Sequence, residues 1–263
     1  MTVPLIQFKQ VYKRFGDNAV LKGVDLSIFQ GEVTAIIGKS GIGKSVLLKH
    51  IIGLLAPDEG DILIQGQALN ALPAIERRRV KMKFSYMFQG TALFDSMTVY
   101  DNVALPLKEK HRVPFKEIGP RVREKLAQLD LVGIEDKYPS QLSGGMKKRV
   151  AMARALVTDP QIVLFDEPTT GLDPIRKNAA HAMIAEYQKT FGFTGVMVSH
   201  EIPDVFYISQ RIAMLDRGRI IFQGRPEDIQ CSSEPVIQQF IQGQAPAHMD
   251  AMPDRQQRAH PQE

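Results

Sequence analysis

The sequence Gly38-Lys39-Ser40-Gly41-Ile42-Gly43-Lys44-Ser45 decides the fold of this chain. It follows an apolar run at residues 33–37 and precedes a helix-like segment at residues 46–52. A strand, a glycine-spaced loop, a Lys-Ser pair and a helix make the arrangement of a P-loop. The glycines let backbone N–H groups approach phosphate oxygens, and the positive end of the helix dipole points at the same phosphates.

The last two residues of this loop carry its polar chemistry. Lys44 supplies a point charge for the β- and γ-phosphates, and the Ser45 hydroxyl supplies a hard oxygen ligand for Mg²⁺. A glycine-rich loop that only turns the chain is the alternative, but the flanking strand and helix argue against it. The loop therefore predicts the binding of a nucleoside triphosphate through residues 38–45.

Composition limits the class of protein. The 263 residues are 44% hydrophobic and 24% charged, which suits one large globular domain with room for an insertion. No apolar run reaches the roughly 18 residues that span a bilayer, and we expect no secretory signal. A single cysteine, Cys231, excludes an intrachain disulfide and fits a reducing, cytoplasmic setting. The formal charge of +4 is too mild to indicate nucleic-acid binding.

The pattern along the chain predicts an α/β fold with a helical insertion. Alternating apolar residues at 3–37 indicate β structure before and into the loop. Between residues 95 and 158 this alternation gives way to helical spacing, interrupted by prolines. After residue 242 Val, Ile, Leu and Phe are absent, which predicts a mobile tail at 243–263. Further strands are expected at residues 61–64, 84–88, 162–165 and 194–198, with a hairpin at 211–223.

Polar residues follow three of these strands, at the edge where a doubly wound sheet binds its ligands. Asp166 and Glu167 end a strand that is apolar throughout, where Asp166 would hold Mg²⁺ and Glu167 could polarise an attacking water. Gln89 and His200 end two others. Each has a structural alternative. Asp166 and Glu167 could be a structural pair, Gln89 a polar strand end, and His200 a structural histidine. The shared edge favours the functional interpretation.

Two further segments are expected to start helices. Ser143, in Leu142-Ser143-Gly144-Gly145-Met146, is a good N-cap, and the two glycines leave the helix start open to an anion. Taken alone, the pattern favours an ordinary cap. Gly171-Leu172-Asp173-Pro174 caps the next helix, and Phe15, beside Gly16, is more typical of a core aromatic than of a ligand contact.

Taken in order, the P-loop and these segments resemble the ATPase subunit of ABC transporters, over roughly residues 5–240. The resemblance implies a P-loop NTPase fold with a RecA-like mixed sheet, an N-terminal antiparallel β subdomain and an inserted helical subdomain at about 95–158. The ATPase domain would occupy residues 1–242, followed by the tail.

The resemblance also implies a mechanism with ATP and Mg²⁺ as cofactors. Such domains work as pairs, and each ATP lies between the P-loop of one subunit and Ser143-Gly144-Gly145 of the other. The resemblance makes Phe15 the aromatic that stacks on adenine, and this replaces the earlier expectation that it lies in the core. The remaining candidates receive roles at the phosphates: Glu167 as base, His200 on the γ-phosphate, Gln89 on Mg²⁺ and water, Asp166 on Mg²⁺, and Asp173 in coupling the two sites.

Two positions depart from the family pattern. Met146 stands where glutamine is usual, and its side chain cannot make the hydrogen bonds of an amide. The Ser143 hydroxyl and the glycine N–H groups remain for phosphate. Lys39 stands where proline is usual, and the sequence assigns it no role.

Residues 89–99 and 101–107, with the signature that ends in methionine, resemble the Mla- and Mkl-type ATPases of MCE systems. Those ATPases energise the trafficking of phospholipid or other hydrophobic substrates between the inner and outer membranes. The resemblance implies a homodimer of nucleotide-binding subunits on an integral-membrane permease, an MCE-type lipid-binding protein and, in some systems, a small regulatory subunit. The chain would then lie on the cytoplasmic face of a bacterial inner membrane, without contact to nucleic acid.

Two alternatives keep the ATPase chemistry. The first is the ATPase of a small-solute importer, for example of amino acids, whose subunits carry similar sequences at 101–107. The second is a non-transport regulatory ATPase of the cell-division type, which signals through a membrane partner. A soluble nucleic-acid ABC protein is disfavoured by the single nucleotide domain and the lack of a coiled-coil arm or a basic tail.

Overall fold

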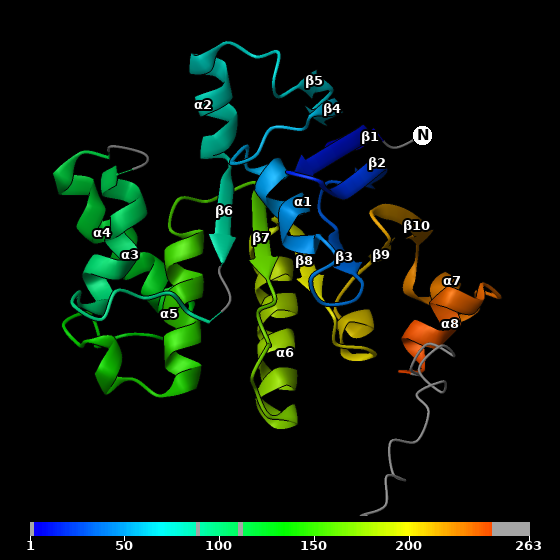
Figure 1. The fold of residues 1–263 in the computed structure, drawn as a ribbon. Coiled ribbons are helices and arrows are strands. Elements are labelled where there is room, and N and C mark those ends of the chain that lie inside the picture. Colours follow the sequence, from blue (N-terminus) through cyan, green and yellow to red (C-terminus); the bar gives the residue numbers. More distant parts are fainter. Residues whose placement is uncertain (1–2, 88–89, 110–112, 244–263) are drawn as a thin grey trace, which may run out of the picture.

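A six-stranded sheet positions the P-loop and the strand-end residues on one edge. The computed structural model describes residues 3–87, 90–109 and 113–243 (Figure 1). The strand order of the sheet is β10-β9-β3-β8-β7-β6, and only β10 runs antiparallel to its neighbour. These strands span β3 Val33–Ile37, β6 Phe84–Met87, β7 Ile162–Asp166, β8 Thr194–Ser199, β9 Arg211–Asp216 and β10 Arg219–Gly224.

The three central strands are buried on both faces. Every residue of β3 and β8 is buried, as is every residue of β7 before Asp166. Continuous apolar runs are typical of parallel strands covered on both sides, which is why these segments fold as they do. The register pairs Ile37 with Ser199 and Asp166 with Val198, so the residues that follow these strands share one edge.

A second sheet is antiparallel, with the strand order β2-β1-β4-β5. Its strands span β1 Ile6–Phe15, β2 Asn18–Ile28, β4 Glu59–Ile64 and β5 Gln67–Ala68. Alternate residues of β1 and β2, such as Phe8, Leu21 and Leu26, point into a core that they share with helix α1, Lys44–Ile51. This hairpin therefore packs beside the P-loop, as the antiparallel β subdomain predicted from the sequence.

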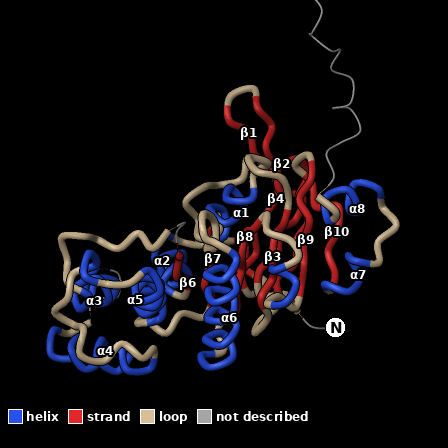
Figure 2. Tube along the Cα trace, turned by 90° about the horizontal axis from the view of Figure 1, so that it is seen from below, coloured by secondary structure: helices blue, strands red, loops and turns tan. Residues whose placement is uncertain are grey.

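Helices gather beyond the edge strand β6, at the opposite end of the molecule from β10 (Figures 1 and 2). They are joined by a continuous core through residues such as Val103, Leu126 and Val150. The helices of this group span α3 Val99–Glu109, α4 Phe115–Gln128 and α5 Gly144–Leu156, with a short 3-10 helix η1 at Pro139–Gln141. The others span α2 Ala74–Met82, α6 Pro174–Phe191, η2 Asp204–Tyr207, α7 Pro226–Gln230 and α8 Pro235–Ile241.

The N-cap expected at Ser143 is confirmed, and one strand ends one residue later than expected. Helix α5 begins at Gly144, because the Ser143 hydroxyl accepts a hydrogen bond from the backbone N–H of Met146 at 3.3 Å and caps it. Strand β7 ends at Asp166, and Glu167 adopts a left-handed backbone with φ 47°. The expected strand end at Phe88 and Gln89 lies outside the described residues, as does most of the expected tail. Among the described residues, no helix is long and apolar enough to cross a membrane.

Candidate nucleotide-binding site

Two glycines fix the path of the P-loop between neighbouring strands. Gly38 has φ 152°, and a Cβ there would meet the carbonyl oxygen of Leu215 on β9. Gly43 has φ 112°, and a Cβ there would lie 2.6 Å from Cγ1 of Val20 on β2. Side chains are excluded at both positions, so the loop backbone rests directly on β9 and on the β1–β2 hairpin. Gly41, Ile42 and Ser40 form the part of the loop between these contacts.

Lys44 is buried although it is cationic. Its side chain is 4% exposed, and Nζ donates to the carbonyl oxygens of Gly38 at 2.8 Å and Lys39 at 3.0 Å. Nζ also lies 3.8 Å from Oε1 of Glu167. Burial lowers the pKa of Lys44, and the negative charges of Glu167 and Asp166 partly oppose that shift. The ammonium group therefore fixes the loop by binding two of its carbonyl oxygens, and it faces the carboxylates at the end of β7.

Asp166 is held by two hydroxyl groups from different elements. Ser45 Oγ on α1 donates to Oδ1 at 2.8 Å, and the Tyr86 hydroxyl on β6 donates to Oδ2 at 2.6 Å. Burial and the bond to Asp166 raise the pKa of Tyr86, which keeps its hydroxyl protonated as a donor. A hydroxyl and a carboxylate oxygen are ligands that suit Mg²⁺, which takes one or two protein ligands together with substrate phosphates. The donors present therefore fit that ion.

Glu167 lies at the centre of the charged groups on this edge. Its Oε1 is 3.3 Å from Nδ1 of His200, and its Oε2 accepts a hydrogen bond from Thr170 Oγ1 at 3.0 Å. The backbone N–H of Glu167 donates to the carbonyl oxygen of Val198 at 3.1 Å, which fixes the left-handed turn after β7. The carboxylate is 20% exposed. It is thus oriented from two sides and still reached by solvent.

The structure brings Lys44, Ser45, Asp166, Glu167 and His200 together by the contacts above. Tyr86 and Thr170 also belong to this cluster, and no sequence motif pointed to them. The only sequence signal for Tyr86 is its place three residues before Gln89 on a strand of the same sheet. Gln89 itself lies outside the described residues.

Phe15 ends β1, in the hairpin that abuts Gly43. Its side chain is 46% exposed, and the Lys13 ammonium lies 5.6 Å from the ring centroid. The expectation of a core aromatic, drawn from the residue pattern alone, is therefore wrong. An exposed aromatic ring in this hairpin is a surface on which a flat group can stack.

Ser143, Gly144 and Gly145 line a different cavity, of about 390 Å³, between α5 and α6. Asp173 adjoins this cavity through Leu172 and caps α6 by accepting the backbone N–H of Arg176 at 3.0 Å. The described chain supplies three cations to the cavity: Lys148, Arg149 and Arg176. Its cationic lining and exposed helix start suit an anion.

Lys39, the second residue of the P-loop, lines a third cavity. Its side chain is exposed and lines a cavity of about 320 Å³ with His200, Asp216 of β9 and Phe240 of α8. Lys39 thus shares a cavity with residues of β9 and α8 as well as with His200.

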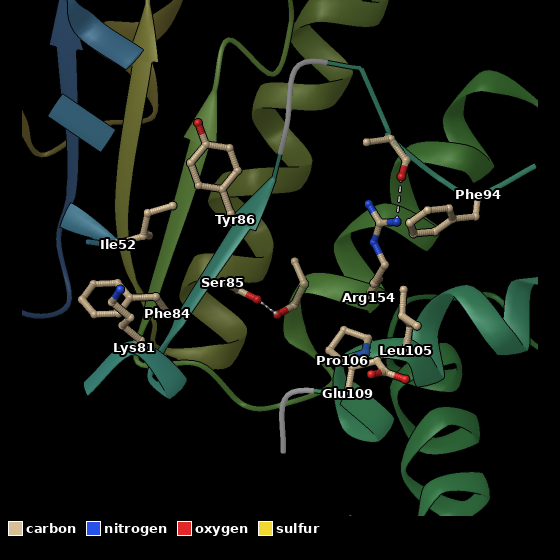
Figure 3. A pocket seen from close by; sticks show the side chains of 12 residues that line it. Ile52, Lys81, Phe84, Ser85, Tyr86, Phe94, Leu105, Pro106, Glu109 and Arg154 are labelled. Atoms are coloured by element: carbon tan, nitrogen blue, oxygen red, sulfur yellow. Dashed lines mark hydrogen bonds between the residues drawn. The ribbon is translucent and has the colours of Figure 1, made fainter. Parts of the chain in front are cut away.

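A groove of about 630 Å³ lies between β6 and the helices α3 and α5 (Figure 3). Three hydrogen bonds lie at this groove. Ser85 Oγ donates to the carbonyl oxygen of Ala155 at 2.6 Å, and Arg154 donates to the carbonyl oxygens of Ala92 at 2.8 Å and Thr91 at 2.9 Å. The rest of the lining is mostly apolar: Ile52, Phe84, Tyr86, Phe94, Leu105 and Pro106, with Lys81 and Glu109.

Comparisons with known proteins agree with this geometry. The family model described as "ABC transporter" matches residues 21–170. The probable ribonucleotide transport ATP-binding protein mkl of Mycobacterium leprae is 41% identical over 90% of this chain and 69% of its own length. The intermembrane phospholipid transport system ATP-binding protein MlaF of Escherichia coli is 37% identical over 91% of this chain and 89% of its own length.

A solved structure gives the same result. CbiO1 of Clostridium perfringens, part of the ABC transporter complex cbiONQ, aligns with a TM-score of 0.79 and 30% identity over 90% of this chain and 94% of its own. The mixed six-stranded sheet and the separate antiparallel sheet agree with the fold expected from the resemblance. This chain therefore belongs to the ABC transporter family, as an ATP-hydrolysing subunit that binds ATP with Mg²⁺ and works as a dimer with a membrane permease.

Proposed function

We propose that this chain energises the transport of phospholipid between membranes, through a separate permease and an MCE-type lipid-binding protein. The observation that carries the ATPase part is the convergence of Lys44, Glu167 and His200 beside the Ser45–Asp166 pair. The proposal that phospholipid is the cargo is supported by two relatives. One is MlaF, and the other is the TRIGALACTOSYLDIACYLGLYCEROL 3 protein of Arabidopsis thaliana, which is 38% identical over 91% of this chain.

The strand-edge residues divide the chemistry between them. Lys44 and the loop N–H groups bind the phosphates, and Ser45 and Asp166 hold Mg²⁺ together with Gln89. When bound, that ion neutralises charge on the phosphate oxygens. Glu167, oriented by Thr170 and His200, accepts a proton from or orients the attacking water. His200 then binds the γ-phosphate, and Phe15 stacks on adenine.

The second half of each site comes from a second copy of the chain. Ser143, Gly144 and Gly145 start a helix of 13 residues whose first N–H groups are exposed, and they line a cationic cavity separate from their own P-loop. A helix start of this kind contributes about 0.3–1 kcal/mol towards an anion, and up to about 2 kcal/mol when buried. Closure of the dimer therefore depends on the triphosphate, and Asp173 couples the two sites from the neighbouring helix cap.

The groove between β6 and the helices is the docking surface for the permease. Its apolar floor, with Phe94 and Leu105, is edged by Lys81, Glu109 and Arg154, a lining that matches a short amphipathic helix. Arg154 fixes the segment that follows Gln89 through Thr91 and Ala92. The occupant would be a cytoplasmic segment of the permease, and the chain would then lie on the cytoplasmic face of the inner membrane. A small regulatory subunit is a further proposed partner.

The test is purification of the intact complex from native membranes, with identification of the co-purified proteins and of bound lipid. We expect a permease, an MCE-domain protein and phospholipid, and ATP-driven transfer of fluorescent phospholipid between vesicles by the complex. A complex that carries the Lys44→Ala variant should assemble without transferring lipid.

Other outcomes would point to other functions. A solute-binding protein in place of the MCE protein would make the complex an importer, and a cell-wall-hydrolase regulator would assign it to signalling. Transport of ribonucleotide without phospholipid would overturn the lipid proposal in favour of the activity that the mkl relative's name gives.

A further inference from the structure

Tyr86 belongs to two sites at once. Its ring lines the groove with Phe84 and Ile52, whereas its hydroxyl donates to Oδ2 of Asp166 at 2.6 Å. In Figure 3 this hydroxyl points away from the groove residues, toward the end of the neighbouring strand, where Asp166 lies. One side chain therefore connects the groove with the carboxylate of the nucleotide site.

The other carboxylate oxygen of Asp166 is held from the opposite side. Ser45 Oγ donates to Oδ1 at 2.8 Å, so two hydroxyls on two elements fix the plane of this carboxylate. Hydrogen bonds to an ionised acceptor are the stronger kind. Because each oxygen of Asp166 has its own donor, the orientation of the carboxylate is fixed. Within the described part of the chain, loss of the Tyr86 hydroxyl would leave Ser45 as the one hydroxyl donor to Asp166, and Oδ2 would lose its anchor.

The backbone beneath Tyr86 cannot move easily. Residues 84–87 pair in parallel register with residues 162–165, and Ser85 is tied to Ala155 of α5. A ligand that presses on the ring must therefore be accommodated by the side chain. Because the phenol is rigid, a shift at its groove side is transmitted to the hydroxyl at its far end.

We propose that Tyr86 is a positioning residue that links occupancy of the groove to the orientation of Asp166, and so to the affinity of the site for the divalent cation. The link rests on the proposed function insofar as the occupant of the groove is the permease. The hydrogen bond to Asp166 does not depend on that occupant, so the two ideas can fail separately.

The first experiment isolates the hydroxyl. Tyr86→Phe keeps the ring in the groove and removes the donor to Asp166. Titration of the isolated chain with Mn²⁺, followed by electron paramagnetic resonance in the presence of a non-hydrolysable ATP analogue, should show about tenfold weaker metal binding. Binding of the same analogue in EDTA should be unchanged. The control is Tyr207→Phe, the same chemical change at a tyrosine that is 83% exposed.

The second experiment tests the link to the groove. Metal affinity is measured for the isolated chain and for the chain assembled with its membrane complex, with and without Tyr86→Phe. We expect assembly to shift the affinity of the wild type at least severalfold and that of the variant much less. Equal shifts in both proteins would overturn the link, as would wild-type metal binding by the isolated variant.

The proposed docking surface has its own readout. Phe94 is 48% exposed in the groove, so Phe94→Glu should preserve the fold while it releases the permease on purification. Retention of the permease by that variant would overturn the docking proposal and leave the Tyr86–Asp166 result standing. Release of the permease together with unaltered metal binding by Tyr86→Phe would do the reverse.

Discussion

The ammonium group of Lys177 lies 2.6 Å from Oε1 of Glu201, which joins the first turns of α6 to the loop that follows His200. Oε2 of the same carboxylate accepts a hydrogen bond from Thr169 Oγ1, two residues after Glu167. The Glu201 side chain is only 8% exposed. One carboxylate thus holds together the segments that carry the proposed base and the proposed γ-phosphate ligand.

Glu201→Gln should destabilise the protein and disturb catalysis. The variant keeps the shape of the side chain but loses a charge-assisted hydrogen bond, which costs about 1.5–3 kcal/mol in the free energy of unfolding. Urea unfolding monitored by circular dichroism would measure this cost. The matched control is Glu186→Gln, because Glu186 is exposed on α6. An unchanged unfolding free energy would show that Lys177 and Thr169 find other partners.

The contribution of Glu201 should also depend on pH. Burial tends to raise the pKa of Glu201, but the hydrogen bonds from Lys177 and Thr169 outweigh it, and the pKa lies below the usual 4.5. A carboxyl whose pKa falls on folding stabilises the folded state above its unfolded pKa and loses that effect as the pH falls through its folded pKa. The difference in unfolding free energy between wild type and Glu201→Gln should therefore be constant near neutrality and shrink below about pH 4.5. A difference that stays constant into acid would contradict this assignment.

Glu167→Gln should lower ATP hydrolysis by about 10²–10⁴-fold, the usual contribution of a general base. The amide keeps the size of the side chain and the contact to Thr170, so ATP binding should persist. Size-exclusion chromatography with ATP and Mg²⁺ should then show a trapped dimer. Steady-state turnover at the wild-type rate would refute the proposed role of Glu167.

Lys44→Ala should abolish ATP-dependent dimerisation. It removes the buried ammonium that binds Gly38 and Lys39 carbonyls, together with the charge proposed for the phosphates. Titration with a fluorescent ATP analogue should show a large loss of affinity. Lys49→Ala serves as the control, because Lys49 is exposed on the same helix. Normal titration of the Lys44 variant would count against its role.

Met146→Gln should leave ATPase activity broadly intact. The Met146 side chain is partly buried against the core of the helical group, while its backbone N–H bonds to Ser143 Oγ. The exposed N–H groups of Gly144 and Gly145 are unaffected by the change. Steady-state hydrolysis by the membrane complex is the measurement. Abolished hydrolysis would mean that the thioether itself is required.

Local signals in the sequence predicted much of this fold. The apolar run at 162–165 is typical of a strand buried on both faces, and the glycine spacing at 38–43 matches the two positions where neighbouring backbone and side chains exclude a Cβ. The start of α5 was predicted as well, because Ser143 is a good N-cap, although the glycines at 144 and 145 are poor helix formers.

The contacts between elements could not be predicted in the same way. The Tyr86–Asp166 hydrogen bond requires that β6 lie beside β7, although about 75 residues separate them in the chain. The Lys177–Glu201 pair likewise depends on where α6 crosses the sheet edge. Periodicity and spacing describe single elements, whereas these side chains meet only through the strand order.

Helix α5 connects the cationic cavity with the groove, because its two ends line these two sites. Its 13 residues make a rod of about 20 Å. Ser143 starts it at the cationic cavity, whereas Arg154 and Ala155 end it at the groove. In the proposed dimer the first end touches the neighbour's ATP and the second touches the permease. The permease segment bound to one subunit would then respond to the ATP in the P-loop of the other subunit. Neither subunit could therefore drive the permease alone.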